Sequence, residues 1–260
     1  MKSSTANTMR LKNFFYLPRF WLLLKMELYR SRKAVLMTIV IALGLHFFID
    51  LLLSPVLSPN RVIYEHSQNY SFSLILGGLI LSSLAFNDLS NTLRRYHYLT
   101  LPASNLEKFT SMWLLTTVGW IIGFTIIYTL YTMVANIIGA LLFSYMDFRA
   151  YDPLNRFSIN AVQYYFVLQG VFLVGATHFK GYVFPKTLFT LILFAAVCGF
   201  IGYFIMSDLF HTDSEGDSSM EFLDGTIVQQ MWLVLQWMFW WILAPLCWVI
   251  TYLGLKDKEV

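Results

Sequence analysis

The sequence predicts an all-α membrane protein with six transmembrane helices, preceded by an N-terminal amphipathic helix that lies in the membrane interface. Hydrophobic residues make up 57% of the 260 residues, charged residues only 13%, and the mean hydropathy is +0.60. A soluble domain carries roughly 25% charged residues. The chain also contains apolar runs of about the length that crosses a bilayer, and its Lys and Arg residues are unequally shared between the connecting segments.

Six apolar segments have a length near the roughly 17–25 residues that cross a hydrocarbon core. We predict spans at 34–53, 72–86, 110–135, 161–178, 187–206 and 231–255. The second is short, and we expect it to extend from Tyr70 to Asp88. Apolar sequence continues after the third span up to Phe143, a run of more than about 45 Å as a helix. That helix must therefore tilt, project past the membrane or break near Gly139.

These spans divide the chain into a cytoplasmic or interfacial segment at 1–33, one transmembrane domain at 34–255 and a short cytoplasmic tail at 256–260. With this division, fifteen Lys and Arg residues fall on one side of the membrane and only Arg61, Arg149 and Arg156 on the other. Positive residues favour the cytoplasm. We therefore expect both termini and residues 89–107 to be cytoplasmic, and the acidic loop 207–228 to be external.

The segment 14–33 combines aromatic, aliphatic and basic residues, as FFYLPRFWLLLKMELYRSRK. Phe20, Leu23, Leu24 and the Glu27–Leu28 pair recur at helical spacing, and Pro18 suits the first turn of a helix. Such a helix can lie in the interface with its apolar side chains in lipid. The alternative interpretation is an ordinary basic flank to the first span.

The polar stretch 87–108 separates two membrane-length runs and has a basic excess. Ser104 and Glu107 have the spacing of a capping box, which predicts that a helix begins at Asn105. Pro102 should end whatever precedes it. Residues 88–99 can form a short amphipathic helix. This composition indicates a docking surface.

No catalytic constellation is present in the sequence. It contains no phosphate-binding G-x-x-x-x-G-K-[ST], no H-E-x-x-H, no G-x-S-x-G and no C-x-x-C. Cys198 and Cys247 both lie inside apolar runs, so neither a disulfide nor a metal site is expected. The net charge of +3 is too small to indicate a nucleic-acid partner. The sequence therefore predicts neither an enzyme nor a cofactor-binding chain.

Charged residues are scarce in the middles of the predicted spans. His46 and Asp50 are four residues apart and share a helical face. They can be structural, water-exposed or part of a transport path. The general scarcity argues against a carrier coupled to protons or sodium.

Small and polar residues in the spans suggest packing and pathway roles. Gly119 and Gly123 form a G-x-x-x-G pattern, which serves either internal helix packing or a dimer seam. Three glutamines and a tryptophan are candidate pathway residues, although they can equally bond across helices or face a partner: Gln163, Gln169, Gln236 and Trp237. Pro245 should kink the last span.

A basic interfacial helix, two spans, a cytoplasmic segment ending in Leu-Pro-x-Ser-x-x-Glu and four further spans together resemble the type-2 ABC-transporter permeases of bacteria. The matching residues are 101–108, the turn 179–186 and the charged tail 252–260, the last being similar to bacteroidete-like members. The resemblance extends over nearly the whole chain.

The resemblance implies a permease subunit of an ATP-driven exporter in the bacterial cytoplasmic (inner) membrane, moving an amphiphilic or hydrophobic substrate. It implies a second permease copy, usually in a homodimer, and a separate ATPase subunit that holds the ATP and magnesium. The segment between the second and third spans would be the coupling helix, with Arg94, Arg95, Tyr96 and His97 as the ATPase-docking residues. The alternatives are a secondary carrier or a non-transport assembly or sensor protein in the membrane.

Overall fold

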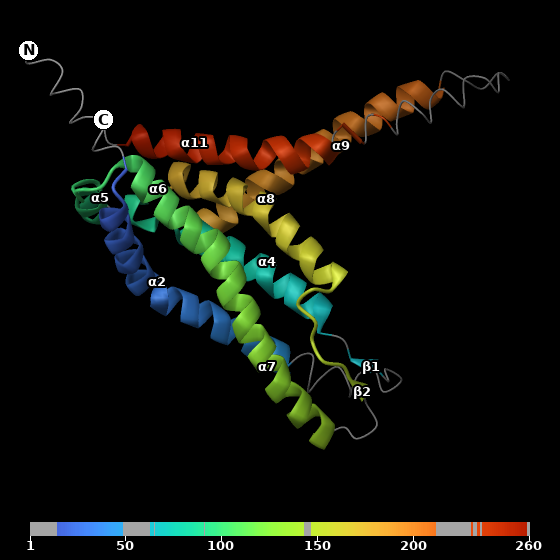
Figure 1. The fold of residues 1–260 in the computed structure, drawn as a ribbon. Helices are drawn as coiled ribbons and strands as arrows, with labels where there is room; N and C mark the ends of the chain where they lie inside the picture. The colour runs from blue at the N-terminus through green and yellow to red at the C-terminus, as the bar shows by residue number, and fades with distance from the viewer. Residues whose placement is uncertain are drawn as a thin grey trace, which may run out of the picture.

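The computed structural model describes residues 15–48, 63–64, 66–90, 92–142, 147–211, 230, 233–234 and 236–258. Within them the chain is built from helices, with one short parallel pairing between β1 (Ile63–Tyr64) and β2 (Asp147–Phe148) (Figure 1). The larger helices are α2 (Leu17–His46), α4 (Ser67–Leu84), α6 (Asn105–Leu114), α7 (Trp120–Leu142), α8 (Arg156–His178), α9 (Val183–His211) and α11 (Ala244–Lys256). The shorter elements are η2 (Asn87–Ser90), α5 (Thr92–Leu99) and the π-helical segments η3 (Leu115–Gly119) and η4 (Phe239–Leu243).

Among the described residues, five helices are long and apolar enough to cross a membrane. They are Ser67–Leu89, Asn105–Leu142, Arg156–His178, Val183–Phe204 and Gln236–Lys256. The prediction of a multi-pass helical membrane protein is therefore confirmed. These helices correspond to five of the six predicted spans. The remaining one, the span predicted at 34–53, lies only partly within the described residues and stays a prediction.

Helix α2 runs without interruption through the boundary predicted at residue 33. Pro18 occupies its first turn, as expected, because a missing N–H costs nothing there. The interfacial segment and the start of the first span are thus one continuous helix. Its placement in the membrane interface remains a prediction.

The structure differs from one local expectation and decides among the alternatives left open for another. The amphipathic pattern over 88–99 predicted one helix, whereas the residues described there belong to two elements, the 3₁₀ turn η2 and the helix α5. The long helix after Asn105 does not break at Gly139, which is buried and helical. A helix from Asn105 to Leu142 is about 57 Å long at 1.5 Å per residue, so it must tilt or project past a hydrocarbon core of about 30 Å.

Pro245 stands at the start of α11, directly after the π-helical segment η4. Proline lacks an N–H and its ring crowds the carbonyl four residues earlier. A wider π-helical turn relieves that crowding. The π-helical segment thus lies where Pro245 disturbs the helix, and the kink expected there stays a prediction.

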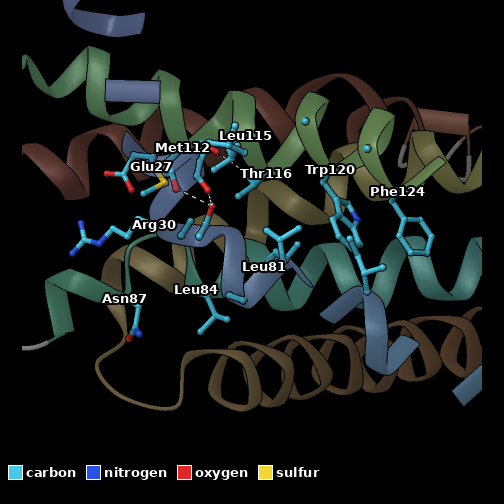
Figure 2. Close-up of a pocket in the computed structure, with 18 of the residues that line it drawn as sticks. Glu27, Arg30, Leu81, Leu84, Asn87, Met112, Leu115, Thr116, Trp120 and Phe124 are labelled. Carbon is cyan, nitrogen blue, oxygen red and sulfur yellow. Dashed lines mark hydrogen bonds between the residues drawn. The ribbon is translucent and has the colours of Figure 1, made fainter. Parts of the chain in front are cut away.

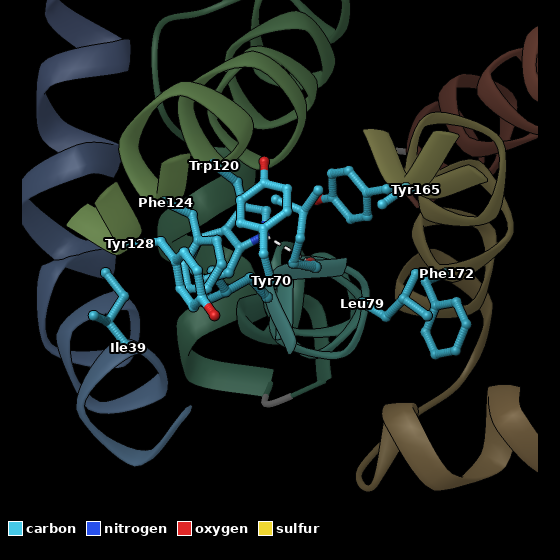
Figure 3. Close-up of a cluster of buried hydrophobic side chains, with 11 residues drawn as sticks. Ile39, Tyr70, Leu79, Trp120, Phe124, Tyr128, Tyr165 and Phe172 are labelled. Atoms are coloured by element: carbon cyan, nitrogen blue, oxygen red, sulfur yellow. Dashed lines mark hydrogen bonds between the residues drawn. The ribbon is translucent and has the colours of Figure 1, made fainter. Parts of the chain in front are cut away.

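Helix α4 lies at the centre of the bundle, where two adjacent glycines allow close packing. A Cβ added at Gly78 would lie 2.2 Å from the Tyr165 ring, and one at Gly77 would lie 2.8 Å from Trp120. The Trp120 indole donates to the Leu74 carbonyl at 3.0 Å. Around this contact gather the aromatic side chains of the main core (Figure 3).

Helix α9 leaves α8 through a tight turn in which Gly181 has φ +76°, a left-handed conformation that glycine adopts readily. A close approach between Gly175 and Thr187 holds the two helices together near this turn. Beyond it α9 diverges from the other helices (Figure 1), and only 6% of its apolar window is buried. Most of α9 is therefore available to lipid or to a partner.

Candidate functional site

The start of α2, α5 and the end of α11 lie together at one end of the bundle (Figure 1). Here we call residues 87–104, which comprise η2, α5 and the following loop, the α5 platform. Three sets of polar contacts attach the platform, or the helix that follows it, to other parts of the bundle.

Glu107 ties the start of α6 to the start of α2. The predicted capping box is present: the Glu107 N–H donates to Ser104 Oγ at 3.2 Å, and the Ser104 N–H donates to Glu107 Oε2 at 2.8 Å. The helix begins at Asn105, as expected. The Arg19 guanidinium donates to both carboxylate oxygens at 2.8 Å, and the Tyr16 N–H donates to Oε1 at 2.7 Å. This fully buried carboxylate therefore joins α2 and α6 by a bidentate contact.

Asp88 attaches η2 to the middle of α2. Its Oδ2 forms an ion pair with Arg30 Nη2, and the two atoms are 2.6 Å apart. The Asp88 side chain is largely buried and the Arg30 side chain is partly exposed. The platform is thus held to α2 at its beginning by this pair and at its end through Glu107.

Arg95 attaches α5 to the C-terminal end of the described chain. Its Nη2 donates to the Lys258 carbonyl at 2.9 Å, and the Lys258 ammonium donates to the Thr177 carbonyl at the end of α8. Burial lowers the pKa of Lys258, and the positive charges of Arg95 and Lys180 lower it further. The two bonds connect α5 to α11 and α8.

The outer surface of α5 carries two large exposed side chains. Leu93 is 79% exposed and Tyr96 is 66% exposed, and their three-residue spacing places them on one face. Tyr98, in contrast, is buried beneath the helix. Of the four predicted docking residues, Tyr96 faces outward and Arg95 makes an internal contact. The side chains of Arg94 and His97 lie outside what the structure describes.

A pocket of about 430 Å³ opens between α2, α4 and the α6–η3–α7 helix, next to the platform. Figure 2 shows Glu27 and Arg30 at one end of it and Trp120 and Phe124 at the other. Glu27 is only 2% exposed, and its Oε1 atom has no hydrogen-bond partner among the described residues. Burial raises the pKa of Glu27 to about 7; the Arg30 charge lowers it and the Asp88 charge adds to the increase.

Gly119 and Gly123 both line this pocket. No described atom lies within 4 Å of a Cβ added at Gly123, and at Gly119 the nearest is 3.5 Å away. Within the described part of the chain, the closest helix contacts instead involve glycines such as Gly78 and Gly175. The packing role predicted for Gly119 and Gly123 stays a prediction.

The predicted pathway residues are not gathered in this pocket. Gln169 is fully buried and donates to Thr116 Oγ1 at 3.0 Å. Gln163, Gln236 and Trp237 are exposed, and none of the four lines the pocket. His46 contacts Ser73 of α4 inside the bundle, while Asp50 lies outside the described residues.

Glu27 is the residue that the sequence analysis did not single out as a site. The available signal was its position: it is the one acidic residue of the basic segment 14–33, and it shares the helical spacing of Phe20, Leu23 and Leu24. A carboxylate on the apolar stripe of a helix is a candidate for a buried group.

Among the described residues, no cluster of His, Cys, Asp and Glu could hold a metal ion.

Comparison with protein-family models, curated proteins and solved structures finds no match for this chain.

Proposed function

We propose that this chain is the membrane-spanning permease subunit of an ATP-driven ABC exporter. It would move an amphiphilic or hydrophobic substrate across a bacterial cytoplasmic membrane, work with a second copy of itself and take its energy from a separate ATPase subunit. The observation that carries the proposal is the α5 platform, a short helix with an exposed apolar face that is attached to several membrane-length helices. The resemblance of its sequence to a coupling segment supports the same interpretation.

The attachments of the platform are suited to transmitting movement. Glu107 connects its end to α2 and α6, and Asp88 connects its beginning to α2. Arg95 connects α5 to the end of α11, and through Lys258 to α8. A displacement of α5 by a moving partner would therefore reach four helices, because each contact is a charge-assisted hydrogen bond or an ion pair.

The surface of the platform is suited to docking. Leu93 and Tyr96 present apolar and aromatic area on the outer face of α5. Exposed aromatic residues are enriched at protein interfaces. The unequal distribution of Lys and Arg along the sequence supports a cytoplasmic position for this end of the bundle, where an ATPase would bind.

The test is co-purification of this chain from its native membranes in a mild detergent, with the recovered proteins searched for an ABC ATPase. Leu93→Ala combined with Tyr96→Ala should reduce the recovered ATPase at least tenfold, as expected when two central interface residues are truncated. Leu154→Ala is the matched control. Leu154 is similarly exposed, but it lies just before the start of α8, whereas the platform is connected to the end of that helix. Equal recovery with all variants, from protein that remains folded, would reject the docking role of α5.

A further inference from the structure

We propose that the pocket between α2, α4 and the α6–η3–α7 helix binds an amphiphile with a cationic amine head. The head would lie against Glu27, and the apolar chain would extend toward Trp120 and Phe124. This proposal gives the exporter a substrate class and to that extent rests on the function proposed above. The binding itself can be measured on this chain without an ATPase.

The size and lining of the pocket suit one apolar chain. Its volume of about 430 Å³ lies within the range of roughly 300–1,000 Å³ that is usual for small-molecule sites. Aliphatic side chains from all three walls line it, among them Ile39, Leu81 and Leu115. The absence of a side chain at Gly123 keeps part of its wall open, since no described atom lies within 4 Å of a Cβ there.

The charges at one end of the pocket favour a cation. Glu27 and Arg30 of α2 and Asp88 of η2 are its charged lining residues, and α4, α6, η3 and α7 contribute no titratable side chain to the lining. Arg30 and Asp88 form an ion pair with each other. When Glu27 is ionised, the three groups together carry one net negative charge.

One carboxylate oxygen of Glu27, the buried Oε1, also lacks a hydrogen-bond partner among the described residues. A buried carboxylate without a donor is costly. An ammonium group supplies both the opposite charge and three N–H donors, whereas a hydroxyl supplies one donor without charge and a sulfate or carboxylate head would be repelled.

The titration of Glu27 gives this site a pH dependence. Burial raises the pKa of Glu27 to about 7, so the carboxyl is substantially protonated at neutral pH when the pocket is empty. Binding of an ammonium head favours the ionised form and displaces that proton. Amine affinity should therefore fall as the pH decreases below about 7.

The experiment uses the purified chain in phosphatidylcholine nanodiscs. The probe is dodecylamine with a photoactivatable diazirine in its chain, and the labelled residues are mapped by mass spectrometry. Unlabelled dodecylamine, dodecanol and dodecyl sulfate are the competitors, because they share one chain length and differ in the head. We expect saturable labelling on α4 and α7 at the pocket, with dodecylamine the strongest competitor.

Two variants test the head and the chain separately. Glu27→Gln keeps the shape and removes the charge, so it should weaken competition by dodecylamine about tenfold and leave dodecanol unchanged. Gly123→Leu fills the pocket and should reduce labelling with every head. Asp152→Asn, an exposed carboxylate outside the pocket, should change neither measurement.

Three results would overturn the proposal: equal competition by the amine and the alcohol, wild-type amine binding by Glu27→Gln, or labelling confined to surfaces outside the pocket. Equal competition would identify the pocket as a site for ordinary lipid chains. Since no ATPase is present, these results leave the co-purification test of the exporter function standing. Failure of that test would equally leave amine binding by the pocket intact.

Discussion

Arg95 donates a hydrogen bond of 2.9 Å to the backbone carbonyl of Lys258, a residue 163 positions further along the chain. The Lys258 ammonium in turn donates to the Thr177 carbonyl, where α8 ends. A surface-facing helix is thereby joined to the C-terminal ends of two membrane-length helices. The family resemblance implies a partner-facing Arg95, but in the folded chain its guanidinium makes this internal connection.

Arg95→Ala should loosen α5 and the end of α11 together. Loss of a half-buried charged donor should cost about 1 kcal/mol of stability. Hydrogen–deuterium exchange should increase in α5 and at residues 256–258 but stay unchanged in α7. Arg156→Ala, an exposed arginine at the start of α8, is the control and should alter neither segment. Unchanged exchange in α5 would show that the Arg95 bond does not hold the platform.

Glu107→Ala should destabilise the protein by about 3 kcal/mol, because it leaves the Arg19 guanidinium without its carboxylate and removes the acceptor for the Ser104 N–H in the capping box of α6. Glu107→Gln should cost less, since its amide oxygen still accepts one of these bonds. Thermal unfolding in detergent measures both. Asp152→Asn should remain within about 0.5 kcal/mol of the wild type. Equal stability of Glu107→Ala and the wild type would contradict a joining role for this carboxylate.

The contacts of Glu107 show which parts of the site could be predicted from sequence. The capping box involves residues three positions apart, so the local pattern at Ser104 and Glu107 was sufficient to predict it. The bonds from Tyr16 and Arg19 come from residues 91 and 88 positions away. No local periodicity encodes such a pairing, because it depends on how α2 and α6 pack in three dimensions.

The membrane-length helices could be predicted because length and apolar composition are local properties. The glycine contacts could not, since a glycine signals a possible close approach without identifying its partner. The G-x-x-x-G pattern predicted close packing at Gly119 and Gly123, whereas among the described glycines the closest approaches of a neighbour occur at Gly78 and Gly175. Tyr165 lies against Gly78 and Thr187 lies against Gly175. Only the folded structure brings these side chains next to the glycines.

Gly78→Ala and Gly123→Ala should change stability in opposite directions. A methyl at Gly78 would overlap the Tyr165 ring at 2.2 Å, and such overpacking costs about 1–3 kcal/mol. A methyl at Gly123 meets no described atom within 4 Å, so the better helix propensity of alanine should add up to about 1 kcal/mol. Thermal unfolding of the two variants checks the difference. Equal effects would mean that the α4–α8 contact is looser than described.

Glu27→Gln should stabilise the protein increasingly as the pH rises. Burial raises the pKa of Glu27 to about 7 from an ordinary 4.5, so the folded state favours the protonated carboxyl. That favourable contribution is complete below about pH 4.5 and is lost as the pH increases through 7. Glutamine stays neutral, and its advantage should reach about 2–3 kcal/mol by pH 9. Unfolding temperatures of the variant and the wild type at pH 5, 7 and 9 measure this advantage. A difference that does not change with pH would contradict a raised pKa of Glu27 in the folded state.

ATP hydrolysis by the partner should be the energy source, and a proton gradient alone should drive no transport. The sequence contains no phosphate-binding loop of its own, so the purified chain should hydrolyse ATP only at background rate.

Sealed vesicles that contain the chain and its ATPase, given either ATP or a proton gradient, measure the export of a fluorescent long-chain amine. His46→Ala tests the other energy source, because the half-buried His46 imidazole contacts Ser73 of α4. Transport driven by the gradient alone and abolished by His46→Ala would favour a secondary carrier over the exporter. Transport that needs ATP and the ATPase, and that a proton gradient alone does not drive, would support the exporter, because a proton-coupled carrier takes its energy from the gradient.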